Sequence, residues 1–224
     1  MSDQTIVHLL RHGEVHNPGG VLYGRLPGFH LSELGRAMAQ RVADSVADRD
    51  IVHIRVSPIE RVRETAAPLA AARGLEPVVD ERLIESSNVF QGKRFGPGWT
   101  SLAHPKSWVH LWNPLRPSWG EPYQQVAARM RSAVIDARDS ARGHEAVVVS
   151  HQLPIWILRL SAEGRMYAHD PRKRECTLCS LTSLHFEGTR LLRVEYSEPA
   201  GDMIPVADKN ATFSSGGARD EGTL

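Results

Sequence analysis

Near its start, this 224-residue chain has the sequence Thr5-Ile6-Val7-His8-Leu9-Leu10-Arg11-His12-Gly13, around which the rest of the fold can be predicted. Its first part, Thr5–Leu10, is a short apolar run with β-branched residues near its start, which predicts a buried strand. An arginine and a histidine follow at once, and the glycine after them lets the backbone approach a ligand closely. We therefore expect a strand that delivers two polar side chains to its carboxyl end.

Helical and strand patterns alternate after this first strand. Apolar residues recur at helical spacing through Ser32–Asp48, and Ile51–Val56 reads as the next strand. Ser57 is expected to cap a second helix, with Pro58 in its first turn and Glu60 completing a capping box. This helix should end near Gly74, with a kink or an early stop at Pro68. The later expected elements are a helix over Tyr123–Arg142, a strand over Ala146–Ser150, a short helix over Leu153–Leu160 and a hairpin of Leu181–Phe186 with Leu191–Tyr196.

This alternation predicts the α/β class. Two of the strands are continuously apolar and so buried on both faces, which favours a three-layer α/β/α sandwich with a mainly parallel central sheet. In such sheets ligands bind beyond the carboxyl ends of the strands. The residues to examine are therefore those that directly follow strands: Arg11–Gly13, Ser57–Arg61 and Ser150–Gln152.

The composition excludes several classes of function. The chain has 27 Lys and Arg against 26 Asp and Glu, a net charge of +1, which speaks against a nucleic-acid binder or a polybasic membrane anchor. No segment approaches the ~20 apolar residues of a membrane span, and no secretory signal is visible. We expect a cytoplasmic protein whose partner is a small molecule. The sequence leaves the oligomeric state open, a homodimer included.

Two cysteines, Cys176 and Cys179, suit a reducing compartment. Their C-x-x-C spacing leaves a redox pair or half of a zinc site as an alternative, but no second pair exists and a strand-like stretch follows them.

Two stretches depart from the alternating pattern. The segment 86–120 holds four of the five tryptophans and four prolines, has no Asp or Glu, and is expected to be a lid or specificity insert. From about residue 199 the chain becomes polar and small, which predicts a flexible tail over 199–224. We therefore expect one domain over residues 1–198.

The residues after the strands combine into one chemical pattern. Arg11 and His12 supply a cation and a nucleophile, and Arg61 near a helix start can add two parallel hydrogen bonds to a phosphate. His151 follows a buried strand at the level where His12 should emerge. Two arginines, two histidines and a helix amino terminus converging on one crevice predict a phosphoryl site.

The motifs resemble those of the histidine phosphatase superfamily, the phosphoglycerate mutase-like proteins. Leu9–Asn17 is similar to the opening signature of the family, and Leu31–Gly35 fits the helix start that follows it. Ser57–Ala66 looks like the second-arginine motif, Arg82–Glu85 like the segment with the acid, and Val149–His151 like the second-histidine motif.

The resemblance implies a role for each matching residue. His12 would attack phosphorus and form a phosphohistidine, while Glu85 would serve as general acid and then base. The equatorial oxygens would be held by Arg11, Arg61, Asn17 and His151, with Gln152 beside them. No cofactor is implied.

A metal site is the chemical rival, because His8, His12 and His16 are spaced by four. If His8 to His12 is extended, four steps place the two residues roughly 13 Å apart, too far to bind one ion. We therefore expect metal-independent catalysis.

Hydrolases and mutases of the family share this core, so the shared motifs do not decide between the two reactions. The segment Gly19–Gly28 and the residues after Glu85 depart from a mutase pattern, and we favour a phosphomonoester hydrolase that acts on small anionic phosphorylated metabolites. A cofactor-dependent mutase is the alternative, and an inactive phospho-ligand binding module is a further one. The residues expected to contact substrate beyond the phosphate are Arg25, Lys93, Arg94 and Arg116.

Overall fold

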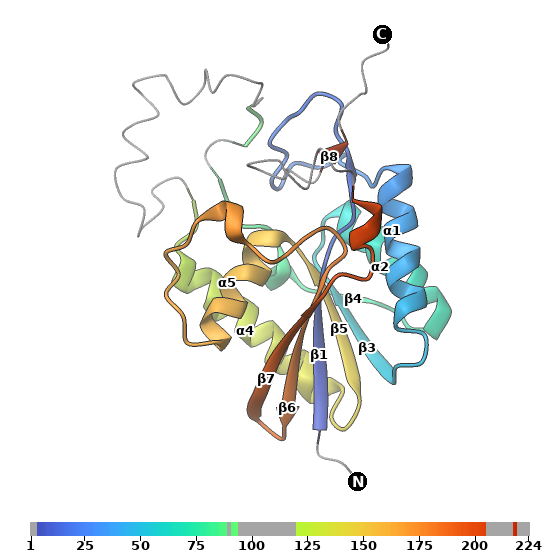
Figure 1. Cartoon of the computed structure of the whole chain (residues 1–224), viewed down its shortest axis with the longest axis vertical. Helices are drawn as coiled ribbons and strands as arrows, with labels where there is room; N and C mark the ends of the chain where they lie inside the picture. Colours follow the sequence, from blue (N-terminus) through green and yellow to red (C-terminus); the bar gives the residue numbers. More distant parts are fainter. Residues whose placement is uncertain (1–3, 89–90, 94–119, 205–216, 219–224) are drawn as a thin grey trace.

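The structure is a computed structural model that describes residues 4–88, 91–93, 120–204 and 217–218. Its centre is a six-stranded sheet with the order β4-β3-β5-β1-β6-β7 (Figure 1). The four strands from β4 to β1 are parallel, and the β6–β7 hairpin is antiparallel, so the expected mainly parallel sheet is confirmed. The strands are β1 Gln4–Arg11, β3 Ile51–Val56, β4 Val78–Val79, β5 Glu145–Ser150, β6 Leu181–Glu187 and β7 Arg190–Ser197.

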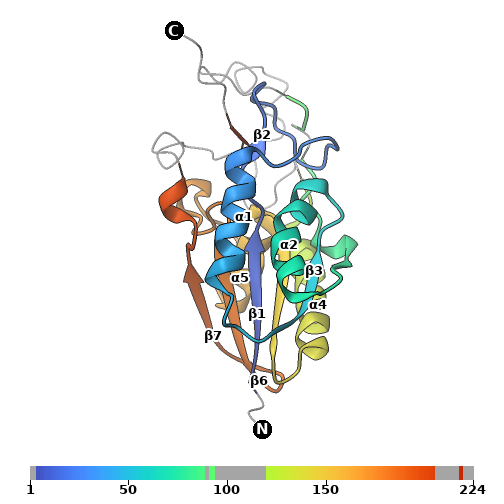
Figure 2. The ribbon, with the colours of Figure 1, turned by 90° about the vertical axis from the view of Figure 1, so that its right-hand side faces the viewer.

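Helices cover both faces of this sheet, which makes the three expected layers (Figures 1 and 2). On one face α1, Glu33–Ser45, and α2, Glu60–Arg73, pack with one apolar cluster of buried residues. On the other face α4, Tyr123–Ser140, and α5, Gln152–Ala162, pack with a second cluster. The short elements are β2 Val15–His16, β8 Gly217–Ala218 and the 3₁₀ turns η1 Glu81–Leu83, η2 Pro171–Lys173 and η3 Gly201–Met203.

The register of the parallel strands brings distant segments together. Arg11 at the end of β1 lies opposite Ser150 at the end of β5, and Val56 at the end of β3 lies opposite Val149. The three carboxyl ends therefore meet at one edge of the sheet, and the residues that follow them share one region. Within the described helices, none is long and apolar enough to cross a membrane.

The start of α2 differs from the expectation. The helix begins at Glu60 with Ile59 as its N-cap, and no side chain caps it. Ser57 is not the cap because its hydroxyl is bonded to His151, 3.0 Å away. The capping box predicted for Ser57 and Glu60 is therefore wrong.

Pro68 does not stop α2, which continues to Arg73 and ends at Gly74 in a left-handed conformation, as expected for a C-cap glycine. Proline removes one intrahelical hydrogen bond, but buried Val62 and Leu69 lie on either side of it. Packing against the sheet thus holds the helix together across Pro68.

The packed part of the chain extends past the expected boundary at 198. Ala200 is fully buried and Ile204 is 8% exposed, and both join the cluster under α1 and α2. These residues correct the expectation of a tail that starts at 199. The two ends of the expected insert meet where Asn88 pairs with Gly120; its residues 94–119, four tryptophans included, lie outside the described residues.

Candidate active site

His12 follows β1 and is buried, with 3% of its surface exposed. Its Nδ1 lies 2.8 Å from the carbonyl oxygen of Gly13. A carbonyl oxygen only accepts, so Nδ1 carries the proton and Nε2 keeps its lone pair. Burial, and then the charges of Arg61 and Arg11, hold the pKa of His12 well below its usual range. His12 is therefore a neutral imidazole with a free nucleophilic nitrogen.

Glycines on both sides of a close backbone contact hold the loop after His12. A Cβ on Gly13 would lie 2.6 Å from the carbonyl oxygen of Gly35, and a Cβ on Gly35 would lie 2.0 Å from that of Glu14. The Gly13 backbone N–H donates to the hydroxyl of Thr65 at 3.1 Å. The loop is thus fixed between α1 and α2, which fixes the place of His12.

Arg61, in the first turn of α2, is fully buried. Its Nη2 donates to the carbonyl oxygen of Gly24 at 2.6 Å, and its guanidinium carbon lies 4.6 Å from the ring centroid of Tyr23. Among the described residues, Nε and Nη1 of Arg61 have no hydrogen-bond partner. Buried donors are nearly always satisfied, so these two N–H groups indicate an anion site.

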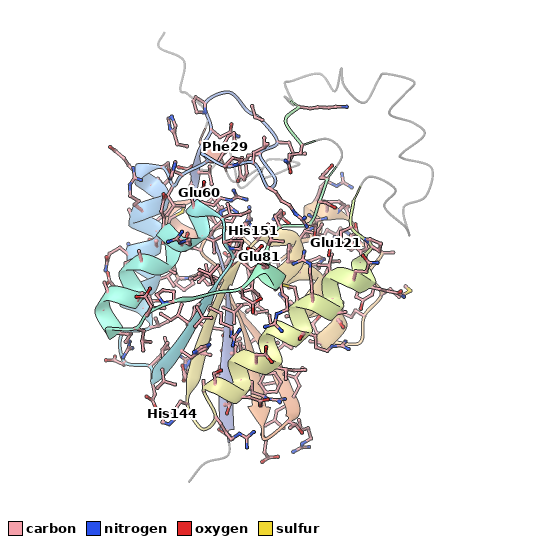
Figure 3. The ribbon with its side chains drawn as sticks, turned by 180° about the vertical axis from the view of Figure 1, so that it is seen from behind. Phe29, Glu60, Glu81, Glu121, His144 and His151 are labelled. Atoms are coloured by element: carbon pink, nitrogen blue, oxygen red, sulfur yellow. The ribbon has the colours of Figure 1, made fainter. Side chains whose placement is uncertain are left out.

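His151 follows β5 and lies at the edge of the sheet where the loops gather, whereas His144 lies at the opposite end (Figure 3). Its Nδ1 is 3.2 Å from Nη2 of Arg61, and its Nε2 is 3.0 Å from the Ser57 hydroxyl. The guanidinium can only donate, so Nδ1 accepts and Nε2 carries the proton. Burial, followed by the charge of Arg61, lowers the pKa of His151 well below its usual range. His12 and His151 are ring neighbours, with centroids 5.3 Å apart.

Arg11 is the second buried arginine of the site, with 3% of its surface exposed. Its Nη1 donates to the carbonyl oxygen of Cys176 at 2.7 Å. Its buried Nε has no partner within the part of the chain that the structure describes. Arg11 and Arg61 thus surround two neutral histidines with positive charge and unpartnered N–H groups.

Glu85 supplies the carboxylate of the site. It follows η1, whose Leu83 carbonyl accepts from the Ser150 hydroxyl at 2.7 Å, so the segment is bonded to the end of β5. An oxygen of Glu85 lies 4.0 Å from Nδ1 of His151. Burial raises the pKa of Glu85 above its usual value, against the opposing effects of the Ser86 backbone N–H and Arg61. A carboxyl with a raised pKa is suited to donate a proton.

The other residues expected in the site have partners of several kinds. Asn17 is buried and bonds Val21 through both ends of its amide, so it shapes its own loop. Gln152 donates to the Cys176 carbonyl oxygen at 3.3 Å, beside Arg11. Lys93 is exposed, while Arg94 and Arg116 lie outside the described residues.

Arg25, which we expected to contact substrate, bonds protein groups through two of its guanidinium nitrogens. Its Nε donates to the carbonyl oxygen of Glu85 at 2.6 Å and its Nη2 pairs with Glu121 at 3.2 Å. Arg129 pairs with the same Glu121, so the acidic segment is held from two sides. Arg25 therefore positions Glu85, and its Nε and Nη2 are bonded to protein groups.

Two metal-site hypotheses came from the sequence, one for the spaced histidines that begin with His8 and one for Cys176 and Cys179, and the surroundings of these residues fit neither. His8 contacts the Ser183 hydroxyl at 2.7 Å and Glu145 at 2.9 Å, on the extended strand β1. No group of three or more metal-ligating side chains occurs among the described residues. Burial raises the pKa of Cys176 to about 11 and that of Cys179 to about 12, the opposite of a reactive redox thiol.

Three residues around the site were not expected from the sequence: Ser57 as the partner of His151, Tyr23 over Arg61, and Arg174 near Arg11. Ser57 directly follows a predicted strand, but a serine at that position is typical of a helix N-cap. Tyr23 and Arg174 lie in connecting segments without periodicity, where no sequence signal indicated them.

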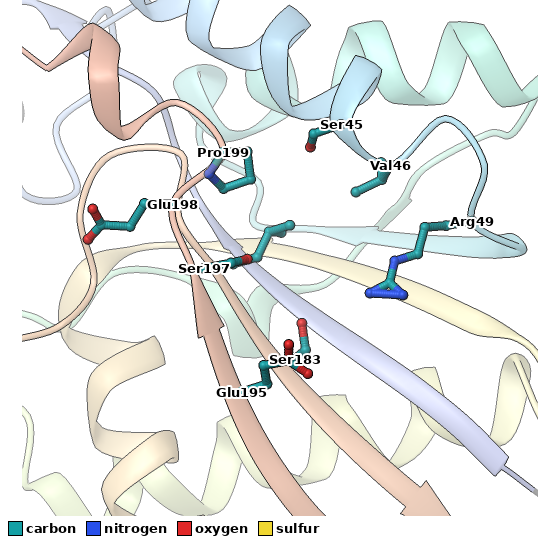
Figure 4. Close-up of a pocket in the computed structure, with 9 residues that line it drawn as sticks. Ser45, Val46, Arg49, Ser183, Glu195, Ser197, Glu198 and Pro199 are labelled. Carbon is teal, nitrogen blue, oxygen red and sulfur yellow. The ribbon is translucent and has the colours of Figure 1, made fainter.

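A separate open groove between α1 and the β6–β7 hairpin contains none of the site residues (Figure 4).

The sequence model of the histidine phosphatase superfamily (branch 1) matches residues 7–198, and the chain belongs to this superfamily. The uncharacterized protein Rv0525 of Mycobacterium tuberculosis (strain ATCC 25618 / H37Rv) is 56% identical over 200 residues, which cover 89% of this chain and 99% of the relative. A probable phosphoglycerate mutase, GpmB of Erwinia tasmaniensis, is 28% identical, with 90% and 95% coverage.

Solved structures agree with this assignment. The native structure of the mycobacterial glucosyl-3-phosphoglycerate phosphatase Rv2419c has a TM-score of 0.69 and 26% identity, and the match covers 87% of this chain and 99% of that one. Bacillus stearothermophilus YhfR also has a TM-score of 0.69, with 25% identity and coverage of 84% and 94%. The relatives thus include phosphatases and mutases, and the superfamily implies one of these two activities.

Proposed function

We propose that this chain is a phosphatase that hydrolyses phosphomonoesters of small anionic metabolites, without a metal ion, through a phosphohistidine at His12. One observation carries the proposal: His12 is neutral, its Nδ1–H is held by Gly13, and its free Nε2 lies beside two arginines with unpartnered N–H groups. A neutral imidazole in a cationic pocket is what in-line attack on a phosphate dianion requires.

In the first step, His12 Nε2 forms a bond to phosphorus as the bond from phosphorus to the ester oxygen breaks. Arg11 and Arg61 offset the charge on the equatorial oxygens, and the Nε2–H of His151 stays with Ser57. Glu85, whose protonated form is favoured by its raised pKa, gives its proton to the leaving oxygen. The products of this step are the free alcohol, the phosphohistidine and an ionised Glu85.

In the second step, Glu85 takes a proton from a water molecule as the water oxygen bonds to phosphorus. The bond between phosphorus and Nε2 breaks, inorganic phosphate leaves, and both side chains return to their starting protonation states. His12 regains its lone pair without having carried a second proton, so its lowered pKa is compatible with the whole cycle.

A hydrolase is favoured over a mutase by two observations. The segment Gly19–Gly28 departs from the mutase pattern, and a mycobacterial phosphatase matches the fold at 26% identity over nearly its full length. A mutase finds its support in the GpmB relative, which is similar at 28% identity. The two reactions diverge only in whether water or a second substrate hydroxyl meets the phosphohistidine.

The test is a trapping experiment with a panel of phosphorylated metabolites. We expect a rapid alkaline quench, in which the acid-labile bond between phosphorus and nitrogen of a phosphohistidine survives, to reveal one labelled histidine in wild type and none in His12→Ala, with phosphate release unaffected by EDTA. Phosphate release from 3-phosphoglycerate that needs no bisphosphate primer supports a hydrolase. Primer-dependent isomerisation would support the mutase, and ligand binding without turnover would support a binding module. The small-molecule partner, the cytoplasmic location and the absence of nucleic-acid or membrane partners remain proposals.

A further inference from the structure

Arg174 is a half-buried arginine between η2 and β6 that the reaction described above does not use. Its Nε donates to Nε2 of His169 at 2.8 Å, and its Nη1 lies 3.4 Å from the side-chain oxygen of Gln152. Partners on two of its three nitrogens, Nε and Nη1, hold the orientation of the guanidinium.

The histidine that holds Arg174 is neutral. Nδ1 of His169 lies 2.6 Å from the carbonyl oxygen of Tyr167, so Nδ1 carries the proton and Nε2 can accept from Arg174. The ring packs against Tyr123 and Trp156, with centroids 5.9 Å away in both cases. Neither His169 nor Gln152 therefore neutralises the charge of Arg174.

No carboxylate of the described residues forms an ion pair with Arg174, and its Nη2 has no hydrogen bond among them. Neighbouring arginines differ, since Arg172 pairs with Asp170 and Arg159 with Glu163 and Glu175. The segment 94–119 contains no Asp or Glu. Among the described residues this half-buried cation has no carboxylate partner, and such a group is suited to an anionic ligand.

Arg174 lies beside the phosphoryl site. Gln152, which accepts from Arg174, donates to the Cys176 carbonyl oxygen, and that same oxygen accepts from Arg11 at 2.7 Å. Arg174 and Arg11 are thus joined through two intervening groups. The charge of Glu85 raises the pKa of Arg174 and the charge of Arg174 lowers the pKa of Glu85, as expected for groups of one site.

We propose that Arg174 binds a second oxyanion on the alcohol part of the substrate, a carboxylate or a second phosphate close to the ester oxygen. This inference rests on the proposed function, because Arg174 is linked through Gln152 and the Cys176 carbonyl to Arg11, which binds the transferred phosphate in that proposal. The substrate class becomes phosphomonoesters whose alcohol carries its own negative charge. A neutral alcohol would leave the Nη2 edge of Arg174 without its ligand.

The test compares substrates that differ only in the second anion. The carboxylate arm pairs 3-phosphoglycerate with glycerol 3-phosphate, and the phosphate arm pairs propane-1,3-diol bisphosphate with the monophosphate. The measured quantity is the ratio of kcat/KM within each pair. We expect wild type to favour the anionic member in one arm, and Arg174→Gln to lower that ratio about 10- to 100-fold. Arg174→Lys should retain part of the ratio.

Arg172→Gln is the matched control, because Arg172 is exposed and already paired with Asp170; its ratio should equal that of wild type. Wild type without a preference in either arm overturns the proposal before any variant is made. An equal loss of kcat/KM for both members of a pair also overturns it. If Arg174→Gln shifts the pH profile equally for both members, Arg174 tunes the pKa of Glu85 and does not bind the second anion, which overturns the proposal too.

Calorimetric binding separates this failure from failure of the proposed function. In the His12→Ala background, 3-phosphoglycerate should bind more tightly than glycerol 3-phosphate, or the bisphosphate more tightly than the monophosphate. Adding Arg174→Gln should remove that difference even if the chain hydrolyses neither compound. A difference that survives the substitution overturns the role of Arg174, whatever the catalytic result.

Discussion

The hydroxyl oxygen of Ser57 lies 3.0 Å from Nε2 of His151, and this bond joins the end of β3 to the end of β5. Arg61 sets the tautomer of His151, because the guanidinium can only donate to Nδ1, and the Ser57 hydroxyl then accepts from the Nε2–H. A serine with the sequence signature of a helix cap thus serves the site, and α2 begins without a side-chain cap.

Ser57→Ala is expected to lower kcat/KM about 10-fold or more. The substitution leaves the Nε2–H of His151 buried without an acceptor, which costs about 1–3 kcal/mol and frees the ring to shift from its place beside Arg61. Steady-state kinetics on one phosphomonoester measures the effect. Ser45→Ala, an exposed serine near the end of α1, is the control and should match wild type. Unchanged kinetics in Ser57→Ala would show that the Ser57 hydroxyl does not position His151.

His12→Asn should lower kcat by at least about 10³-fold, because the nucleophile is removed while the arginines remain. The nearby exposed His16, changed to Asn, is the matched control and should retain activity. The measurement is initial rate together with phosphohistidine trapping. A variant at position 12 that keeps its rate and loses only the trapped label would argue for direct attack by water.

Glu85→Gln should slow hydrolysis of alkyl phosphates about 10²- to 10⁴-fold, the range that proton transfer to a poor leaving group contributes. An ester of p-nitrophenol needs little protonation, so its first step should suffer much less. Exposed Glu81, in the same segment, gives the control Glu81→Gln. Equal losses for both esters would remove the acid role from Glu85 and leave it a structural one.

The pH profile of kcat/KM should fall on its acid side below pH 6.5. His12 acts as a neutral nucleophile, and burial beside Arg61 lowers its pKa, so protonation and loss of activity occur only as the pH falls through that lowered value. The alkaline side should report Glu85, which must be protonated and whose pKa is raised above its usual value by burial. An acid limb at or above pH 6.5 is the contrary result.

Gly35→Ala should lower the free energy of unfolding by about 1–3 kcal/mol. Alanine normally stabilises a helix interior relative to glycine, by roughly 0.5–1 kcal/mol, so the sign of the effect is diagnostic. Here the new Cβ would lie 2.0 Å from the Glu14 carbonyl oxygen, between α1 and the loop after His12. Urea unfolding measures the change, and a variant as stable as wild type would mean that the loop can move away.

The sheet and the centre of the site could be predicted because their signals are local. An apolar run followed by Arg11 and His12 carries both the strand and the polar residues at its end, and the same holds for His151. Since the parallel strands end at one edge, convergence of these side chains follows from the architecture alone.

The remaining contacts depend on partners that are far away in the chain. Ser57 has a hydroxyl that could cap a helix or bond a histidine, and only the fold brings His151 within reach. Arg25 carries the same charge whether it faces a ligand or the Glu85 carbonyl, so its sequence position left that choice open. Ala200 is buried because η3 folds back beside α1, which no periodicity in that short segment announces.

The pairing of β1 with β5 has a consequence for refolding. Arg11 and Ser150 lie opposite each other in this pair, so His12 and His151 become neighbours only when two segments from distant parts of the chain have docked. Such non-local contacts form late, because loop closure must precede them. The return of activity during refolding therefore reports when β1 and β5 pair at the centre of the sheet. Helix formation, measured by circular dichroism, should be complete earlier.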